Sequence, residues 1–179
     1  ILISYLTVRK RSFLTGILDT VTMFPYIIPG SVLGISFLYA FNSKPLLLSG
    51  TAIIIIISLS IRRMPYTIRS STAIIGQISP SVEEAAISLG CTFVKVTVPM
   101  MMSGVLSGAI MSWITLISEL SSSIILYTSK TQTLTVAIYA EVIRSNFGNA
   151  AAYSTILTLT SILSLLVFFK VTGSNDISI

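Results

Sequence analysis

Long apolar runs that end in basic residues limit what this chain can fold into more than any other feature. One run extends from about Leu46 to Met64, another begins near Pro99, and the last covers about Ala150 to Phe169. A helix needs about 20 apolar residues to cross a hydrocarbon layer about 30 Å thick. Only 9% of the residues are charged, whereas a soluble domain has about 25%. The runs therefore predict an all-α, polytopic bundle of transmembrane helices surrounded by membrane lipid.

The first complete run, from about Ile17 to Phe41, contains helix-disturbing residues. Pro25 and Pro29 each lack a backbone N–H, and Gly30 follows directly. In a membrane, the carbonyl groups that proline leaves unpaired must be satisfied by neighbouring helices or by water. This run is expected either to form a simple kink, or to pack inside the bundle or border a cavity.

Two other segments are too polar for an ordinary membrane span. Residues 65–97 form the longest polar connection, and residues 133–144 are typical of a short interfacial or re-entrant helix. The run that begins near Pro99 could continue to Tyr127. Because this is longer than one crossing needs, it is expected to tilt or to break near Glu119.

The basic residues predict the orientation, because short loops rich in Lys and Arg stay in the cytoplasm. If the cluster at residues 9–11 is inside, the 65–97 connection is cytoplasmic as well. This orientation places eight basic residues inside and three outside. The eight are Arg9, Lys10, Arg11, Arg62, Arg63, Arg69, Lys95 and Lys170, and the three are Lys44, Lys130 and Arg144.

Several classes of function are disfavoured. Nucleic-acid binding needs basic residues clustered on a solvated face, whereas here they end apolar runs, so no nucleic-acid partner is expected despite the net charge of +5. The chain has no histidine, and its single cysteine, Cys91, cannot form an internal disulfide. An intramembrane enzyme would need a nucleophile with a positioned base, paired aspartates or a metal motif. No enzyme activity is therefore expected.

The cytoplasmic connection contains a short helical pattern with small residues on one face. Ser81 and Glu84 have the spacing of a capping box, and Gly90 can supply the turn that ends a helix. The apolar members recur at the i, i+3, i+4 and i+7 spacing of one face, and they are Val82, Ala85, Ala86 and Leu89. The segment is therefore either an ordinary amphipathic surface helix or a helix that docks closely into a groove.

Glu84-Ala85-Ala86, followed after three residues by Gly90, resembles the EAA signature of ABC-importer permeases. Val96-Thr97-Val98-Pro99 is similar to the later element of the same signature. In that family the loop forms a coupling helix seated in a cleft of the ATPase subunit. The resemblance implies that the ATPase-coupling residues are Glu83, Glu84, Ala85, Ala86 and Gly90.

The loop differs from the family pattern in length. Only residues 91–95 separate Gly90 from Val96, fewer than is usual in the family. Either this protein has a compact loop, or residues have been lost and docking of the ATPase is in doubt.

Three further segments resemble iron(III) importer permeases of the type I kind. They are residues 24–30 with Gly34, residues 62–66 with Arg69-Ser70, and residues 118–121. Since the resemblance covers nearly the whole chain, residues 1–179 are expected to be a type I ABC transmembrane permease domain, and a fragment that makes up most of one permease half.

The resemblance also implies a mechanism and partners. It implies a multi-pass permease of the bacterial inner (cytoplasmic) membrane that imports iron(III). Permeases for thiamine, polyamines or phosphonates share much of the architecture, so those cargoes stay open, and a carrier driven by an ion gradient is a further alternative. The expected partners are ABC ATPase subunits, an extracytoplasmic substrate-binding protein and a second permease half, fused or separate. Since the chain has no G-x-x-x-x-G-K-[ST] motif, it is expected to bind no cofactor, and ATP is used by the partner.

Glu119 lies within an apolar run and is flanked by serines. An ionisable residue in a membrane span by default faces the bundle interior and marks a pathway or a polar partner. Ser118, Glu119 and Ser122 are therefore candidates for the substrate path, and the Glu119 carboxylate is a candidate oxygen ligand for the transported metal ion. Alternatively, Glu119 lies at the outer headgroup level and is hydrated.

Overall fold

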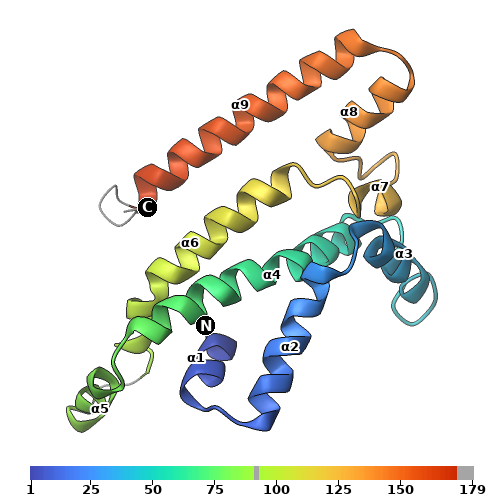
Figure 1. Cartoon of the computed structure of the whole chain (residues 1–179). Helices are drawn as coiled ribbons and strands as arrows, with labels where there is room; N and C mark the ends of the chain where they lie inside the picture. The colour runs from blue at the N-terminus through green and yellow to red at the C-terminus, as the bar shows by residue number, and fades with distance from the viewer. Residues whose placement is uncertain (91–92, 173–179) are drawn as a thin grey trace. The chain divides into compact units, whose positions relative to one another are not determined.

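The computed structural model describes residues 1–90 and 93–172. The described residues form nine helices and no strand, which confirms the all-α prediction (Figure 1). Cys91 and the end of the chain from residue 173 lie outside the described residues. The helices are α1 (Leu2–Arg9), α2 (Phe13–Ile27), α3 (Gly30–Ala40), α4 (Ala52–Gln77), α5 (Pro80–Ser88), α6 (Thr97–Ile117), α7 (Ser123–Leu126), α8 (Leu134–Ile143) and α9 (Phe147–Thr172).

The chain divides into two compact units. The first contains Ile1–Phe24 and Met64–Ser112, and the second contains Pro25–Arg63 and the described residues from Trp113 onward. The helices α2, α4 and α6 therefore each contribute residues to both units. The loop with the EAA-like sequence belongs to the first unit, whereas Glu119 belongs to the second.

Within the first unit, α6 packs closely against α4 at two glycines. A Cβ atom on Gly104 would lie 3.0 Å from the Ser70 carbonyl oxygen, and one on Gly108 would lie 3.1 Å from the Thr67 nitrogen. Small residues let membrane helices approach this closely. On another side of α4, the buried hydroxyl of Ser4 in α1 donates a hydrogen bond to the Ile68 carbonyl oxygen at 3.0 Å.

The predicted end of the second apolar run is wrong. The sequence predicts a span over residues 46–64 that ends at Arg62 and Arg63, but α4 begins at Ala52 and continues through Pro65 to Gln77. The physical reason is that both guanidinium groups are largely buried and form ion pairs with the carboxylate of Glu119, which belongs to the same unit as the two arginines. These arginines therefore lie inside a helix, and α4 is not among the described helices that are apolar enough to cross a membrane.

The proline-rich run forms two helices with a sharp bend between them. Pro25 lies inside α2, whereas Pro29 precedes α3 with an extended backbone, φ −54° and ψ 138°. The bend therefore falls at Pro29, where the helix is interrupted and not simply kinked. By length and composition, two described helices, α6 and α9, are long and apolar enough to cross a membrane. The number of candidate spans rises to three if the bent pair of α2 and α3 is counted as one span.

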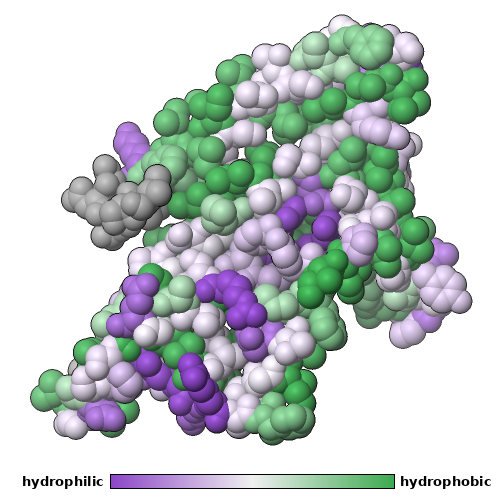
Figure 2. Space-filling model, in the orientation of Figure 1, coloured by the Kyte–Doolittle hydropathy of each residue, from purple (hydrophilic) through white to green (hydrophobic). Residues whose placement is uncertain are grey.

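The second unit contains the C-terminal helices. There α8 and α9 lie side by side and α3 contacts α7 (Figure 1), and Ile54, Ile55 and Leu126 form a small core. The short helix predicted over residues 133–144 is confirmed as α8, and the break predicted near Glu119 lies between α6 and α7. The surface of α9 is mostly hydrophobic or neutral in Figure 2, as is expected of a helix that contacts lipid.

Candidate coupling loop and buried charge cluster

A proline begins the helix α5, and a glycine forms the turn after its end. Pro80 occupies its first turn, where a missing N–H is tolerated, and Gly90 beyond its end has φ +72°, the left-handed conformation that favours glycine. The capping box predicted for Ser81 and Glu84 is wrong. Because the helix already begins at Pro80, the N-cap residue is Ser79, and its hydroxyl is hydrogen-bonded to the Ser81 hydroxyl at 2.7 Å.

Most of α5 is open to solvent, and the helix has no buried residue. Val82 is 40% exposed and Leu89 is 82% exposed, and Ala85 is exposed as well. Ala86 is only partly exposed and lines a small cavity of about 50 Å³ together with Tyr5 of α1. Three members of the predicted small-residue face therefore point outward, whereas Ala86 points toward α1.

The two adjacent glutamates of α5 have different surroundings. The Glu83 side chain is 11% exposed and forms an ion pair with Arg9 at 2.8 Å, while Glu84 is exposed. Arg9 Nε donates a hydrogen bond to Glu83 Oε1 at 2.9 Å, and Arg9 Nη2 donates one to the Ile78 carbonyl oxygen at 2.6 Å. Among the residues predicted for coupling, Glu83 is thus bound within the chain, and Glu84 is accessible from outside.

Both carboxylate oxygens of Glu119 are ion-paired. Arg62 Nη1 donates to Glu119 Oε1 at 2.7 Å, and Arg63 Nη2 donates to Oε2 at 2.5 Å. Arg63 Nη2 also donates to the Thr115 carbonyl oxygen at 2.9 Å, and the Ser122 amide donates to Glu119 Oε1 at 3.3 Å. The Glu119 side chain is only 6% exposed. The alternative of a hydrated Glu119 is therefore wrong.

This arrangement does not suit the predicted metal-ligand role of Glu119. Its oxygens are occupied by Arg62 and Arg63, and two guanidinium groups around one carboxylate leave a net positive charge, which repels a cation. In the described part of the chain, no group of three or more His, Cys, Asp or Glu residues could hold a metal ion. Glu119 instead connects α4 to the break after α6.

Sequence reasoning missed Arg62 and Arg63 as partners of Glu119. A signal for this pairing was present, since a carboxylate within a membrane span is expected to pair with a basic residue. Arg62 and Arg63 are adjacent basic residues at the end of an apolar run and are therefore candidates for that partner. The sequence alone indicates the end of a span at these arginines, because their partner is more than fifty positions away in sequence.

The serines predicted for the substrate path lie in different surroundings. Ser122 is fully buried next to Glu119. Ser118 lines a shallow groove of about 380 Å³ together with residues of α8 and α9, among them Thr135 and Leu157. The structure therefore does not place the two serines in one open path.

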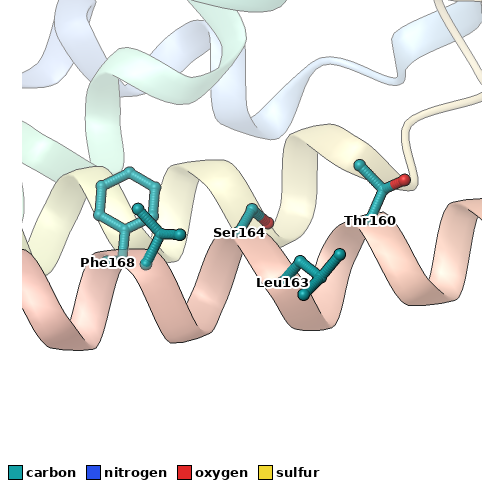
Figure 3. Close-up of a pocket in the computed structure, with 5 residues that line it drawn as sticks. Thr160, Leu163, Ser164 and Phe168 are labelled. Carbon is teal, nitrogen blue, oxygen red and sulfur yellow. The ribbon is translucent and has the colours of Figure 1, made fainter.

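A second groove, of about 410 Å³, lies along α9. Thr160, Ser164 and Phe168 point to the same side of this helix (Figure 3). Ser164 accepts a hydrogen bond from Trp113 Nε1 at 2.7 Å, and the Trp113 and Phe168 rings lie 6.1 Å apart. No charged residue is among those that line the groove. The groove therefore suits a lipid chain or an apolar helix better than a charged solute.

The chain is similar to known transport proteins along nearly its whole length. A family model described as "Binding-protein-dependent transport system inner membrane component" matches residues 1–173. The chain is 33% identical to the ferric transport system permease protein FbpB of Actinobacillus pleuropneumoniae over 181 residues, which covers 99% of this chain and 26% of that protein. The chain thus spans about a quarter of the length of that relative.

Two other relatives are named for different solutes. The molybdate/tungstate transport system permease protein WtpB of Pyrococcus furiosus is 30% identical over 178 residues, 94% of this chain and 67% of that protein. The putative 2-aminoethylphosphonate transport system permease protein PhnV of Salmonella typhimurium is 28% identical over 153 residues, 83% of this chain and 58% of that protein.

Proposed function

Because this chain belongs to the family of binding-protein-dependent transport system inner membrane components, we propose that it forms most of one half of the permease of an ATP-driven importer in the bacterial inner membrane. Its membrane helices shape the path, and ABC ATPase subunits supply the energy. An extracytoplasmic binding protein delivers the solute, and a second permease half completes the path. The chain itself binds no cofactor.

The observation that carries this proposal is the exposed helix α5 between the long helices α4 and α6. Val82, Ala85 and Leu89 present a small apolar face that no described residue of the chain covers. Such a face stabilises a complex when it enters a groove of a partner. The ATPase subunit docks on this face and on Glu84, and Gly90 shapes the turn that follows.

Iron(III) is the cargo that the similarity favours, since the ferric permease matches 99% of the chain. The ion reaches the path from the binding protein, and Glu119 is not its ligand because Arg62 and Arg63 occupy that carboxylate. A second candidate is an oxyanion such as a phosphonate. The excess of guanidinium over carboxylate groups in this cluster favours it, and two of the relatives are named for oxyanions.

Ala85→Arg should abolish binding of the ATPase subunits. Ala85 is exposed on α5, so an arginine there fits the folded chain but not a close groove. The measurement is co-purification of the ATPase subunits with the complete permease in detergent. Ser43→Arg adds the same side chain at an exposed position between α3 and α4 and should leave co-purification unchanged. Equal amounts of bound ATPase in both variants would contradict docking on α5.

A further inference from the structure

The C-terminal end of α1 contacts the loop around α5 at several points. Arg9 Nη2 donates to the carbonyl oxygen of Ile78, which lies just before α5, and the same guanidinium group binds Glu83 within α5. The Arg9 and Glu83 side chains are only 13% and 11% exposed. One arginine therefore fixes both the start of the helix and its first turns.

The segment after α5 is also in contact with α1. The rings of Tyr5 and Phe93 meet edge to face, with centroids 4.8 Å apart and an interplanar angle of 74°. This is a favourable geometry for an aromatic pair. Tyr5, Glu83 and Phe93 all line the small cavity beside Ala86. The helix α1 thus contacts the loop before, within and after α5.

The helix α5 depends on such contacts for its position. It has nine residues and buries none of them, and isolated helices this short are marginally stable in water. The ion pair of Arg9 with Glu83 is charge-assisted and largely shielded from solvent, which makes it stronger than a surface pair. Within the first unit, Ser4 connects α1 in turn to α4. The helix α1 therefore contacts both α5 and α4.

We propose that Arg9 is a positioning residue for the coupling helix, and this proposal rests on the proposed function. Arg9 holds α5 against α1 through Glu83 and Ile78, so that movement imposed on α5 by the ATPase reaches the membrane helices through α1. Glu83 and Glu84 then have separate roles. Glu83 transmits movement inside the permease, whereas Glu84 faces the ATPase subunit.

The test uses the complete importer in proteoliposomes, with Arg9→Gln and Glu83→Gln as single variants. Both should retain bound ATPase subunits but lose the stimulation of ATP hydrolysis by the loaded binding protein by about tenfold, the change expected for loss of one hydrogen-bonded charge pair. The charge exchange Arg9→Glu with Glu83→Arg should recover part of the stimulation, because it restores the ion pair but not the hydrogen bond from position 9 to the Ile78 carbonyl oxygen. Arg11→Gln removes an equal charge from an exposed position two residues away and should retain normal stimulation.

Three results would overturn the role of Arg9. They are unchanged stimulation in Arg9→Gln, loss of the ATPase subunits from that variant, and failure of the charge exchange to restore stimulation. The proposed function fails by a different result, namely normal ATPase binding in Ala85→Arg. The two failures are therefore distinguishable.

Discussion

Replacing Glu119 with alanine should destabilise the permease by about 3–5 kcal/mol, the usual effect of breaking a buried ion pair from one side. The reason is that Arg62 and Arg63 both donate to this carboxylate and are only 13% and 12% exposed. The substitution leaves two guanidinium groups without their anion in a place that water reaches poorly. The measurement is the free energy of unfolding, or the loss of folded protein on heating, for the purified permease in detergent.

Glu141→Ala is the matched control for that substitution. Glu141 also forms an ion pair with an arginine, at 3.0 Å, but its partner Arg144 is 72% exposed. The Glu141 side chain is itself 15% exposed and also accepts a hydrogen bond from Asn146 Nδ2 at 2.8 Å. Because both of these donors are exposed to water, this variant should lose only about 1 kcal/mol. If Glu119→Ala and Glu141→Ala change the stability equally, the buried cluster does not stabilise the fold as described.

Gly30→Val should have the second largest effect on stability. A Cβ atom on Gly30 would lie 2.8 Å from the Ser121 Cβ atom and would overlap the Arg62 guanidinium group. Valine therefore forces Arg62 away from Glu119 and crowds the segment after α6. Overpacking of this kind costs about 1–3 kcal/mol, and loss of the ion pair adds to it. The same unfolding measurement in detergent tests the effect.

Gly16→Val provides the comparison for Gly30→Val. Gly16 also lies in a helix, α2, but no atom lies within 4 Å of a Cβ atom built there. The change of residue type is identical, so any difference between the variants reports the surroundings of Gly30. Gly16→Val should unfold at nearly the temperature of the unchanged protein, and equal losses in both variants would argue against close packing at Gly30.

Patterns that depend on neighbouring residues predicted much of the fold. The apolar runs predicted α6 and α9 as membrane helices, and the composition of residues 133–144 predicted α8. The extra length of the run after Pro99 predicted its break near Glu119. In each case the apolar composition and length of one local segment determine the outcome.

Contacts between distant segments account for most of the features that the sequence did not predict. The continuation of α4 past Arg62 depends on a carboxylate 57 positions away, and the inward position of Glu83 depends on Arg9, 74 positions earlier. A charged residue at the end of an apolar run indicates a loop when its ion-pair partner cannot be identified from the sequence. The start of α5 differs from the predicted one for a local reason, because Pro80 begins the helix before Ser81 can cap it.

The most direct test of the account is uptake of radioactive iron(III) into proteoliposomes that contain the complete permease and its ATPase, with the loaded binding protein outside. The account predicts uptake that requires ATP hydrolysis on the ATPase side and disappears in the Ala85→Arg variant. Uptake that proceeds on an ion gradient without ATP, or that is unchanged by Ala85→Arg, would contradict an ATP-driven permease coupled through α5.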